Sequence, residues 1–235
     1  MNLFFCRNIK DNIAILDETE SHHCIKVLRL STGDEICLVD GKGGYFEGQI
    51  SIPDHRNCTI EIKKSDFETG KRDYSLHVAM APTKNIERFE WFLEKSTEIG
   101  IDQITPLLCN RSERKILRID RLEKVITSAM KQSLKAYHPV LHPMTEFDTF
   151  LKSESAGEKL IAHCMDGTRQ DLIKMKNTGN NFTILIGPEG DFTLQELDFA
   201  FAKGFLPVSL GTSRLRTETA GIVCCQIIAD LMSLK

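Results

Sequence analysis

The chain has 235 residues, which is enough for one large domain or two small ones. Hydrophobic residues make up 41% and charged residues 27% of it, a balance that excludes a disordered or collagen-like chain. The formal net charge of −3 argues against a general nucleic-acid binder. The charge is unevenly distributed, however, because residues 110–135 contain eight Lys or Arg and three Asp or Glu. A local basic patch able to hold phosphate is therefore expected there.

The same composition predicts a cytoplasmic protein with no membrane segment. No run of about 18 apolar residues is present, and the opening MNLFFCRNIKDN lacks the layout of a signal peptide. Neither His22-His23-Cys24 nor the pair His138 and His142 has the second ligand pair of a structural zinc site, so no metal is expected. The cysteines lie in apolar stretches without any CxxC pair and are expected to be reduced core residues: Cys6, Cys24, Cys37, Cys58, Cys109, Cys164, Cys224 and Cys225.

The first seventy residues predict a small β-barrel. A helix is expected over Glu18–Leu30, where apolar residues recur at helical spacing. The turn Asp40-Gly41-Lys42-Gly43-Gly44 tolerates positive φ angles and predicts a hairpin between its flanking strands. The polar stretch Asp66–Asp73 is interpreted as a linker. The expected strands are Leu3–Cys6, Ile13–Leu16, Glu35–Val39, Tyr45–Ile52 and Thr59–Lys63.

From Tyr74 onward strands alternate with helices, which predicts an α/β domain with a mostly parallel sheet covered by helices on both faces. The expected strands are Leu76–Met80, Ile104–Leu107, Lys159–Cys164, Phe182–Ile186 and Pro207–Leu210. The expected helices are Asn85–Gly100, Leu117–Ala136, Asp171–Lys176, Thr193–Lys203 and Thr217–Leu234, with Thr193 as a candidate N-cap.

Two of these helices carry basic stripes. Around the first helix, Lys84, Arg88, Trp91, Lys95 and Glu98 share one face, which suits either a polyanion or a solvated surface with Glu98 paired to Lys95. On helix Leu117–Ala136 the outward face contains no acidic residue, so a continuous basic ridge that contacts phosphate is expected. Its members are Arg121, Lys124, Ser128, Lys131 and Lys135.

Two glycine-bearing loops at strand ends carry the most specific signal. The run IGPEGDFT (186–193) follows an apolar strand, at the edge where open α/β sheets bind ligands, and matches neither nucleotide-binding fingerprint. Glu189 and Asp191 favour a ligand that is cationic or neutral there. The run LGTSRLRTETA (210–220) repeats the strand, loop and helix arrangement. In a purely structural interpretation, Thr217 would cap the helix and Glu218 would stabilise the helix dipole. In a functional interpretation they would take part in binding or catalysis, and both interpretations stay open.

The sequence resembles that of a known protein family. The two loops are accompanied by His22-His23 with Val27-Leu28-Arg29, the Asp40-Gly41 turn, Lys84, Lys95, Thr97-Glu98-Ile99-Gly100, Arg111-Ser112 and Gln132-Ser133. Over nearly the whole chain this set is similar to the SPOUT class of S-adenosylmethionine (SAM)-dependent RNA methyltransferases, and within it to the RsmE type, which methylates uridine N3 in 16S ribosomal RNA. Asp191, where the family usually has glycine, and Lys135, where arginine is common, are departures.

The resemblance implies an architecture and a cofactor. Residues 1–70 would form a PUA-like RNA-binding barrel, and residues 74–235 a SPOUT domain whose C-terminal part is threaded into a trefoil knot, working as a homodimer. Periodicity alone would have predicted an unknotted sheet. The cofactor would be SAM, held by Ile186, Gly187, Pro188, Glu189, Gly190, Leu210, Gly211, Leu215, Arg216 and Thr217.

The resemblance also implies roles in catalysis and RNA binding. Arg216 would orient the uracil or the cofactor carboxylate, and Glu218 would accept the N3 proton. The partner would be 16S rRNA, within the small ribosomal subunit. Candidate RNA contacts are Arg7, His23, Arg29, Lys84, Arg88, Arg111, Lys124, Lys131 and Lys135. The alternatives are a SPOUT methyltransferase acting on another nucleotide and a non-catalytic RNA-binding or ribosome-assembly factor.

Overall fold

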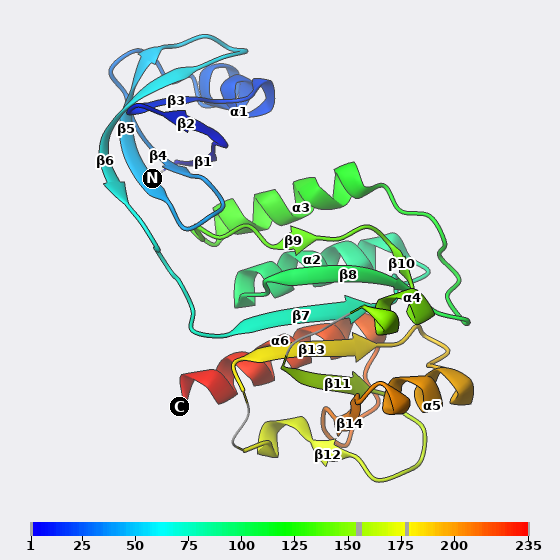
Figure 1. Cartoon of the computed structure of the whole chain (residues 1–235). Helices are drawn as coiled ribbons and strands as arrows, with labels where there is room; N and C mark the ends of the chain where they lie inside the picture. The colour runs from blue at the N-terminus through cyan, green and yellow to red at the C-terminus, as the bar shows by residue number, and fades with distance from the viewer. Residues whose placement is uncertain (1, 154–156, 177–178, 235) are drawn as a thin grey trace. The chain divides into compact units, whose positions relative to one another are not determined.

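A computed structural model describes residues 2–153, 157–176 and 179–234 (Figure 1). They form two compact units: the first contains the residues up to Lys71 together with Thr127–His138, and the second contains Arg72–Ile126 and the residues from Pro139 onward. The boundary near residue 72 coincides with the expected linker. Thr127–His138, expected in the second domain, makes its contacts with the first unit. Residues 1 and 235, the outer limits of the two expected domains, lie outside the described part.

Among the described residues of the first unit, six strands form one sheet in the order β1-β4-β5-β6-β3-β2. All neighbours are antiparallel except β1 and β4. The expected hairpin is confirmed, because the Asp40 carboxylate accepts hydrogen bonds from the backbone N–H groups of Lys42 (2.7 Å) and Gly44 (2.9 Å). The strands are β1 (Leu3–Phe5), β2 (Asn8–Lys10), β3 (Ile13–Ile15), β4 (Glu35–Val39), β5 (Tyr45–Ile52) and β6 (Thr59–Asp66). Of these, β2 was not expected.

The helix expected over Glu18–Leu30 is divided into two short pieces. An α-helix, α1 (Glu18–His22), is followed by a π-helix, η1 (His23–Val27). The wider turn ends where the Leu28 N–H donates to the His23 carbonyl at 2.9 Å and Arg29 takes a positive φ of 59°. It allows Cys24 and its apolar neighbours to pack on the barrel core. Apolar spacing does not distinguish a π-turn from an α-turn, so the sequence predicted one continuous helix.

The segment Thr127–His138 is fixed to the first unit by backbone pairing. The Gly43 N–H donates to the Ala136 carbonyl at 3.0 Å, and the His138 N–H donates to the Gly41 carbonyl at 2.9 Å. The His138 ring also stacks on Phe5, with 5.3 Å between the ring centroids. The glycine-rich turn thus has a second partner besides its own hairpin.

The second unit is built on a parallel sheet in the order β10-β8-β7-β13-β11-β14-β12, with β9 also paired to β8. Every strand pair in it is parallel, so the carboxyl ends of the strands share one edge, and the arrowheads of β7, β13 and β11 point the same way in Figure 1. The strands are β7 (Ser75–Met80), β8 (Gln103–Leu108), β9 (Val140–Leu141), β10 (Thr145–Glu146), β11 (Glu158–Ala162), β12 (Gln170–Asp171), β13 (Asn181–Ile186) and β14 (Leu206–Ser209).

Helices cover both faces of this sheet, as the alternating pattern predicted. Successive residues of β7 point to opposite sides: Val78 belongs to a core shared with α2 (Ile86–Ile99), α3 (Ile119–Gln132) and α6 (Thr217–Ser233), and Ala79 belongs to a core shared with α4 (Phe147–Lys152) and α5 (Leu194–Ala202). The α/β fold class is confirmed. The knot stays a prediction.

Helix ends agree with the sequence where capping determines them. Thr193 caps α5, and its hydroxyl and the Glu196 carboxylate form a reciprocal capping box. The expected helix Leu117–Ala136 is shorter, because Leu134 has a positive φ of 55° just after α3. The helix expected over Asp171–Lys176 is a single 3-10 turn, η2 (Leu172–Lys174). The short elements β9, β10, α4 and β12 were not expected, since they are too brief to show periodicity.

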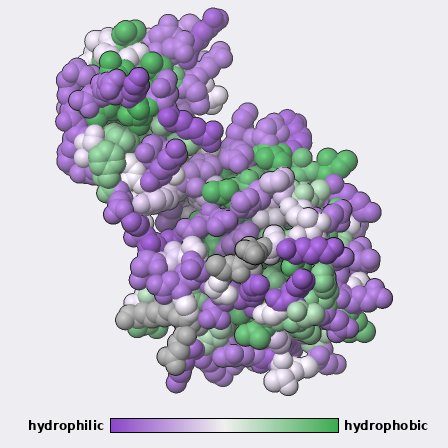
Figure 2. Space-filling model, in the orientation of Figure 1, coloured by the Kyte–Doolittle hydropathy of each residue, from purple (hydrophilic) through white to green (hydrophobic). Residues whose placement is uncertain are grey.

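One face of the structure is shown in space-filling form in Figure 2. On the face shown in Figure 2, purple hydrophilic side chains predominate and green apolar ones are scattered between them. No described helix combines the length and the apolar character needed to cross a lipid bilayer.

His77 is a half-buried titratable group in the second unit. Its Nε2 lies 2.8 Å from the Thr105 hydroxyl, and its ring centroid lies 5.4 Å from that of His142. Burial, followed by the nearby His142, lowers the pKa of His77 from 6.5 to about 4. The folded state therefore favours the neutral imidazole.

We expect His77 to make the fold sensitive to acid. Because its folded pKa lies below its unfolded pKa, its stabilising contribution is present above pH 6.5 and is lost as the pH falls toward 4. Urea unfolding at about pH 7 and about pH 4.5 should show that the wild type loses up to about 3 kcal/mol more than His77→Gln over this interval. Equal losses in the two proteins would contradict the assignment.

Candidate functional site

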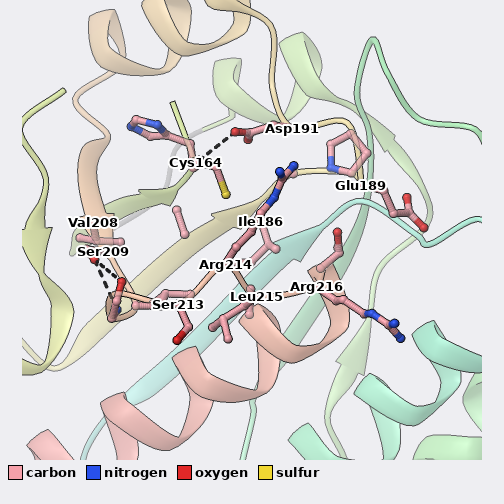
Figure 3. A pocket seen from close by; sticks show the side chains of 18 of the residues that line it. Cys164, Ile186, Glu189, Asp191, Val208, Ser209, Ser213, Arg214, Leu215 and Arg216 are labelled. Atoms are coloured by element: carbon pink, nitrogen blue, oxygen red, sulfur yellow. Dashed lines mark hydrogen bonds between the residues drawn. The ribbon is translucent and has the colours of Figure 1, made fainter. Parts of the chain in front are cut away.

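A pocket of about 330 Å³ lies at the carboxyl edge of the parallel sheet (Figure 3). Since β13 is parallel to β7 and β11, and β14 is parallel to β11, the loops that follow β13 and β14 meet at this edge. Both glycine-bearing loops of the sequence therefore line one cavity. The expected cofactor residues among its lining are Ile186, Gly187, Pro188, Glu189, Leu210, Gly211, Leu215, Arg216 and Thr217. Gly190 is not among them.

The two loop glycines are needed for different reasons. A Cβ on Gly187 would lie 3.1 Å from the buried Phe192 ring, so the absence of a side chain lets the loop fold back on itself. Gly211 has a φ of +118°, but nothing lies within 4 Å of a Cβ placed there. The backbone angle, rather than lack of space, favours glycine at 211, and the pocket wall stays open at that point.

Asp191 ties the first loop to the end of β11. Its Oδ2 accepts a hydrogen bond from the Cys164 N–H at 2.8 Å, and its Oδ1 accepts one from the Phe192 N–H at 2.8 Å. Its φ is +60°, a conformation that glycine adopts easily and that aspartate tolerates better than most residues. Asp191 therefore holds a backbone angle that suits glycine and accepts two hydrogen bonds that a glycine could not.

The same loop is fastened on its other side. The Glu189 carboxylate accepts from the Lys84 N–H at 2.9 Å, just beyond β7. Arg111, which follows β8, donates to the Gly190 carbonyl at 2.7 Å. Arg111 was expected to contact RNA; its side chain is exposed while it makes this hydrogen bond, and the RNA contact stays a prediction.

Glu218 is buried in the first turn of α6, with 6% of its side chain exposed. Its Oε1 lies 3.8 Å from Nε of Arg88, while its Oε2 has no hydrogen-bond partner within the described part of the chain. Arg88 lines the pocket and Glu218 does not. The expectation that Thr217 caps this helix is wrong, because the N-cap position is occupied by Arg216, without a side-chain cap.

Opposite charges lie on the two loops of the pocket. Figure 3 shows Glu189 and Asp191 on the loop after β13, and Arg214 and Arg216 on the loop before α6. Arg216 is exposed at the pocket and forms no ion pair among the described residues. The pocket therefore offers both a negative and a positive wall to a ligand.

A third wall was not anticipated. Residues just beyond β11, among them His163, Cys164 and Arg169, line the pocket, and Arg169 donates to the His163 carbonyl at 2.5 Å. Burial lowers the pKa of His163 from its ordinary value. Cys164 is exposed, so its interpretation as a core cysteine is wrong, whereas the other seven cysteines are buried. A signal was available in the sequence, because the expected strand Lys159–Cys164 belongs to a mostly parallel sheet, in which the carboxyl ends of the strands share one edge.

The expected RNA contacts are distributed over both units. Arg7, His23 and Arg29 are exposed on the first unit, while Lys84 and Arg88 border the pocket region of the second. Lys124 is exposed on α3, and Lys135 is half-buried in the first unit.

The continuous basic ridge is not observed. Lys131 is largely buried in an ion pair with Glu20 at 2.5 Å, with side chains 19% and 8% exposed. Arg121 donates to Glu90 at 2.8 Å. Acidic partners from other elements thus neutralise positions that the helix sequence left unpaired, and a helical face cannot reveal such partners.

Comparisons with known proteins identify the class that this fold and pocket define. A family described as "RNA methyltransferase domain" matches residues 71–229, and one described as "RNA methyltransferase PUA domain" matches residues 16–63. A curated relative from Synechocystis, "Ribosomal RNA small subunit methyltransferase E", is 30% identical over 92% of this chain and 73% of its own length. The chain belongs to this family of RNA methyltransferases.

Solved structures agree over the full length. A probable rRNA methyltransferase from Porphyromonas gingivalis is 38% identical with a TM-score of 0.91, and the match covers 100% of this chain and 99% of that one. A ribosomal RNA small subunit methyltransferase E from Neisseria gonorrhoeae, bound to S-adenosyl methionine, is 27% identical with a TM-score of 0.85, covering 100% and 98%.

Substitutions at Asp191 should separate its two contributions. Asp191→Ala removes the carboxylate and keeps a side chain at positive φ, so we expect a loss of about 1–2 kcal/mol in the free energy of unfolding. Asp191→Gly removes the same hydrogen bonds but relieves the backbone, and should be more stable than the alanine variant by about 1 kcal/mol. Urea unfolding measures both, and an alanine variant as stable as the glycine variant would disprove the strain argument.

Proposed function

We propose that the chain transfers a methyl group from SAM to N3 of a uridine in 16S ribosomal RNA of the small subunit. The observation that carries this is the single pocket formed by residues 186–189 and 210–217 at the carboxyl edge of the sheet. The family membership and the SAM-bound relative support the same function. The activity is that of a SAM-dependent rRNA (uridine-N3) methyltransferase.

The pocket fits a ligand of the SAM type. Backbone groups around Gly211 are accessible because this exposed residue has no side chain to cover them, and Leu210 and Leu215 supply apolar surface. Exposed guanidinium groups such as Arg216 suit a carboxylate. When bound, SAM supplies an activated methyl group on a sulfonium that leaves as a neutral thioether. We propose that the pocket-lining residues named above hold it, with Gly190 contributing through the position of the loop.

The chemical task left to the protein is to orient the uracil and remove one proton. Uracil N3 forms the new N–C bond while the carbon–sulfur bond breaks, and the N3 proton passes to a base. We propose that Arg216 orients the uracil or the cofactor carboxylate and stabilises negative charge on the ring. We propose Glu218 as the proton acceptor, since its buried Oε2 is uncommitted among the described residues. The Arg88 guanidinium lies beside this carboxylate, with 3.8 Å between its Nε and Oε1 of Glu218.

RNA binding is assigned to both units. The match to a PUA domain supports RNA contact by the first unit, where Arg7, His23 and Arg29 are exposed. Contacts to phosphate add affinity without sequence information, so choice of the uridine must come from the pocket and from the folded RNA. The target base has to be unstacked to reach the pocket. The cytoplasm, where ribosomal subunits are made, remains the expected location.

The proposed enzyme is a homodimer with a knotted second unit. On α6, Cys224 and Ile228 are buried against the sheet, whereas Ala220, Val223, Ile227 and Leu231 at helical spacing stay only half-buried in the single chain. A second copy would cover this face. Sedimentation at micromolar concentration should give about twice the chain mass. A monomer that still methylates RNA would contradict the proposal.

A side chain at position 211 should block the cofactor. Gly211→Leu places its side chain in the open space of the pocket, so SAM affinity measured by calorimetry should fall by at least about 100-fold, beyond the weak effect of backbone strain. Gly204→Leu is the matched control, because Gly204 also has a positive φ and nothing within 4 Å of a Cβ placed on it but does not line the pocket. Unchanged affinity in Gly211→Leu, with a native circular dichroism spectrum, would refute the site.

The product decides between the proposed reaction and its alternatives. A methyl group on N3 blocks the Watson–Crick edge, so reverse transcriptase should stop just before the modified uridine in treated small-subunit RNA, and nucleoside mass spectrometry should show 3-methyluridine. Glu218→Gln should bind SAM normally but lower kcat by about 100-fold or more. Another methylated nucleotide would favour a different SPOUT methyltransferase, and SAM binding without methylation would favour a non-catalytic RNA-binding factor.

A further inference from the structure

A second hollow lies on the loop between β8 and α3. It has a volume of about 440 Å³ and is lined by Lys84, Glu113, Arg114, Lys115 and Ile116. We call it the 113–116 hollow. Its lining contains three cations, one carboxylate and one aliphatic side chain, which is unlike the glycine-rich and arginine-rich cofactor pocket.

The backbone around the 113–116 hollow is held in place by hydrogen bonds. The Arg114 guanidinium donates to the carbonyls of Thr83 at 3.1 Å and Lys84 at 2.6 Å. At the start of the same loop the Cys109 N–H donates to the Ser112 hydroxyl at 3.0 Å. Arg114 is therefore used to hold the loop, and its charge is half-buried beneath the hollow.

Two side chains of the loop, Lys115 and Ile116, are exposed and available to contact a ligand. Lys115 is exposed and forms no ion pair with any described residue. Ile116 is 81% exposed, which leaves its aliphatic surface accessible to a ligand in the hollow. The Lys84–Glu113 pair at 2.8 Å is itself exposed, at 74% and 56%, so it is weak and can exchange Glu113 for a stronger anion.

The hollow is linked to the cofactor pocket by a hydrogen bond between a residue of each. Lys84, which lines the hollow, donates its N–H to Glu189, which lines the pocket. Arg111, at the base of the same loop, donates to the carbonyl of Gly190. Because β8 is parallel to β7, the loop that carries the hollow leaves the sheet at the pocket edge (Figure 1). A chain that places one nucleotide in the pocket would pass its neighbour over this hollow.

We propose that the 113–116 hollow binds the ribonucleotide adjacent to the target uridine, with its phosphate on Lys115 and Lys84 and its base or ribose against Ile116. This inference rests on the proposed function. An aliphatic side chain beside a displaced base is the arrangement that proteins use to keep bases unstacked. Ile116 is thus a positioning residue that holds the RNA open, and Lys115 supplies a phosphate contact without sequence information.

The test compares loop variants with matched surface controls in the full-length protein. Ile116→Ala and Lys115→Ala change the hollow, while Ile116→Leu keeps its aliphatic surface. Ile173→Ala removes another exposed isoleucine of the second unit, and Lys203→Ala removes another exposed lysine; neither residue lines the pocket or the hollow. The measurements are methyl transfer to small-subunit RNA, binding of the same RNA at several salt concentrations, and SAM affinity.

We expect Ile116→Ala to lower kcat/KM for RNA about tenfold and Ile116→Leu to restore it, with SAM affinity unchanged. Lys115→Ala should reduce the slope of log affinity against log salt by about 0.7 to 0.9, the value of one phosphate contact. The inference is overturned if the wild type methylates RNA and both loop variants behave like the controls, or if they lose SAM affinity as well. A wild type that transfers no methyl group defeats the proposed function first, and the hollow with it.

Discussion

The attachment of the Gly187–Phe192 loop to its surroundings is the constraint on which the rest of the site depends. The Asp191 carboxylate holds the loop to the N–H group that follows β11, Glu189 holds it to the N–H group of Lys84, and Arg111 donates to its carbonyl at Gly190. Hydrogen bonds with one charged partner are stronger than neutral ones. Three of them, directed to three different chain segments, fix the wall of the pocket before a ligand arrives, so binding does not have to order this loop.

These attachments also explain why a count of charges along the chain is an incomplete guide to RNA contacts. Arg111 and Lys131 were both expected to face RNA, but one donates to a backbone carbonyl and the other is paired with Glu20. Each partner is more than 70 residues away in the chain. A helical face or a basic run shows how many charges are present, whereas the structure determines which of them already have a partner. Lys115, part of the same basic run, is one that stays exposed.

The sequence was most informative where a short segment determines its own secondary structure without contacts from elsewhere in the chain. Alternating strands and helices predicted the parallel sheet, Thr193 as a candidate N-cap predicted the start of α5, and glycine at 187 and 211 marked both pocket loops. It was least informative where tertiary contacts choose among local possibilities. The π-turn at His23–Val27 and the pairing of Ala136 with Gly43 depend on the barrel core and on a turn far away in sequence. No spacing of apolar residues encodes them.

The charge layout of the pocket is consistent with the proposed chemistry. In a methyl transfer from a sulfonium to a deprotonated uracil, a cation and an anion become two neutral products, so each charge is greatest before the transfer. Carboxylates of Glu189 and Asp191 lie on the loop after β13, and guanidiniums of Arg214 and Arg216 lie on the loop before α6, so in the proposed reaction both charged reactants would meet opposite charges at the pocket (Figure 3). The two carboxylates are already held by hydrogen bonds from backbone N–H groups, so this part of the charge layout needs no reorganisation when a ligand binds. The same charged side chains would bind the neutral products less tightly than the charged reactants. The loss of charge during methyl transfer would therefore promote product release.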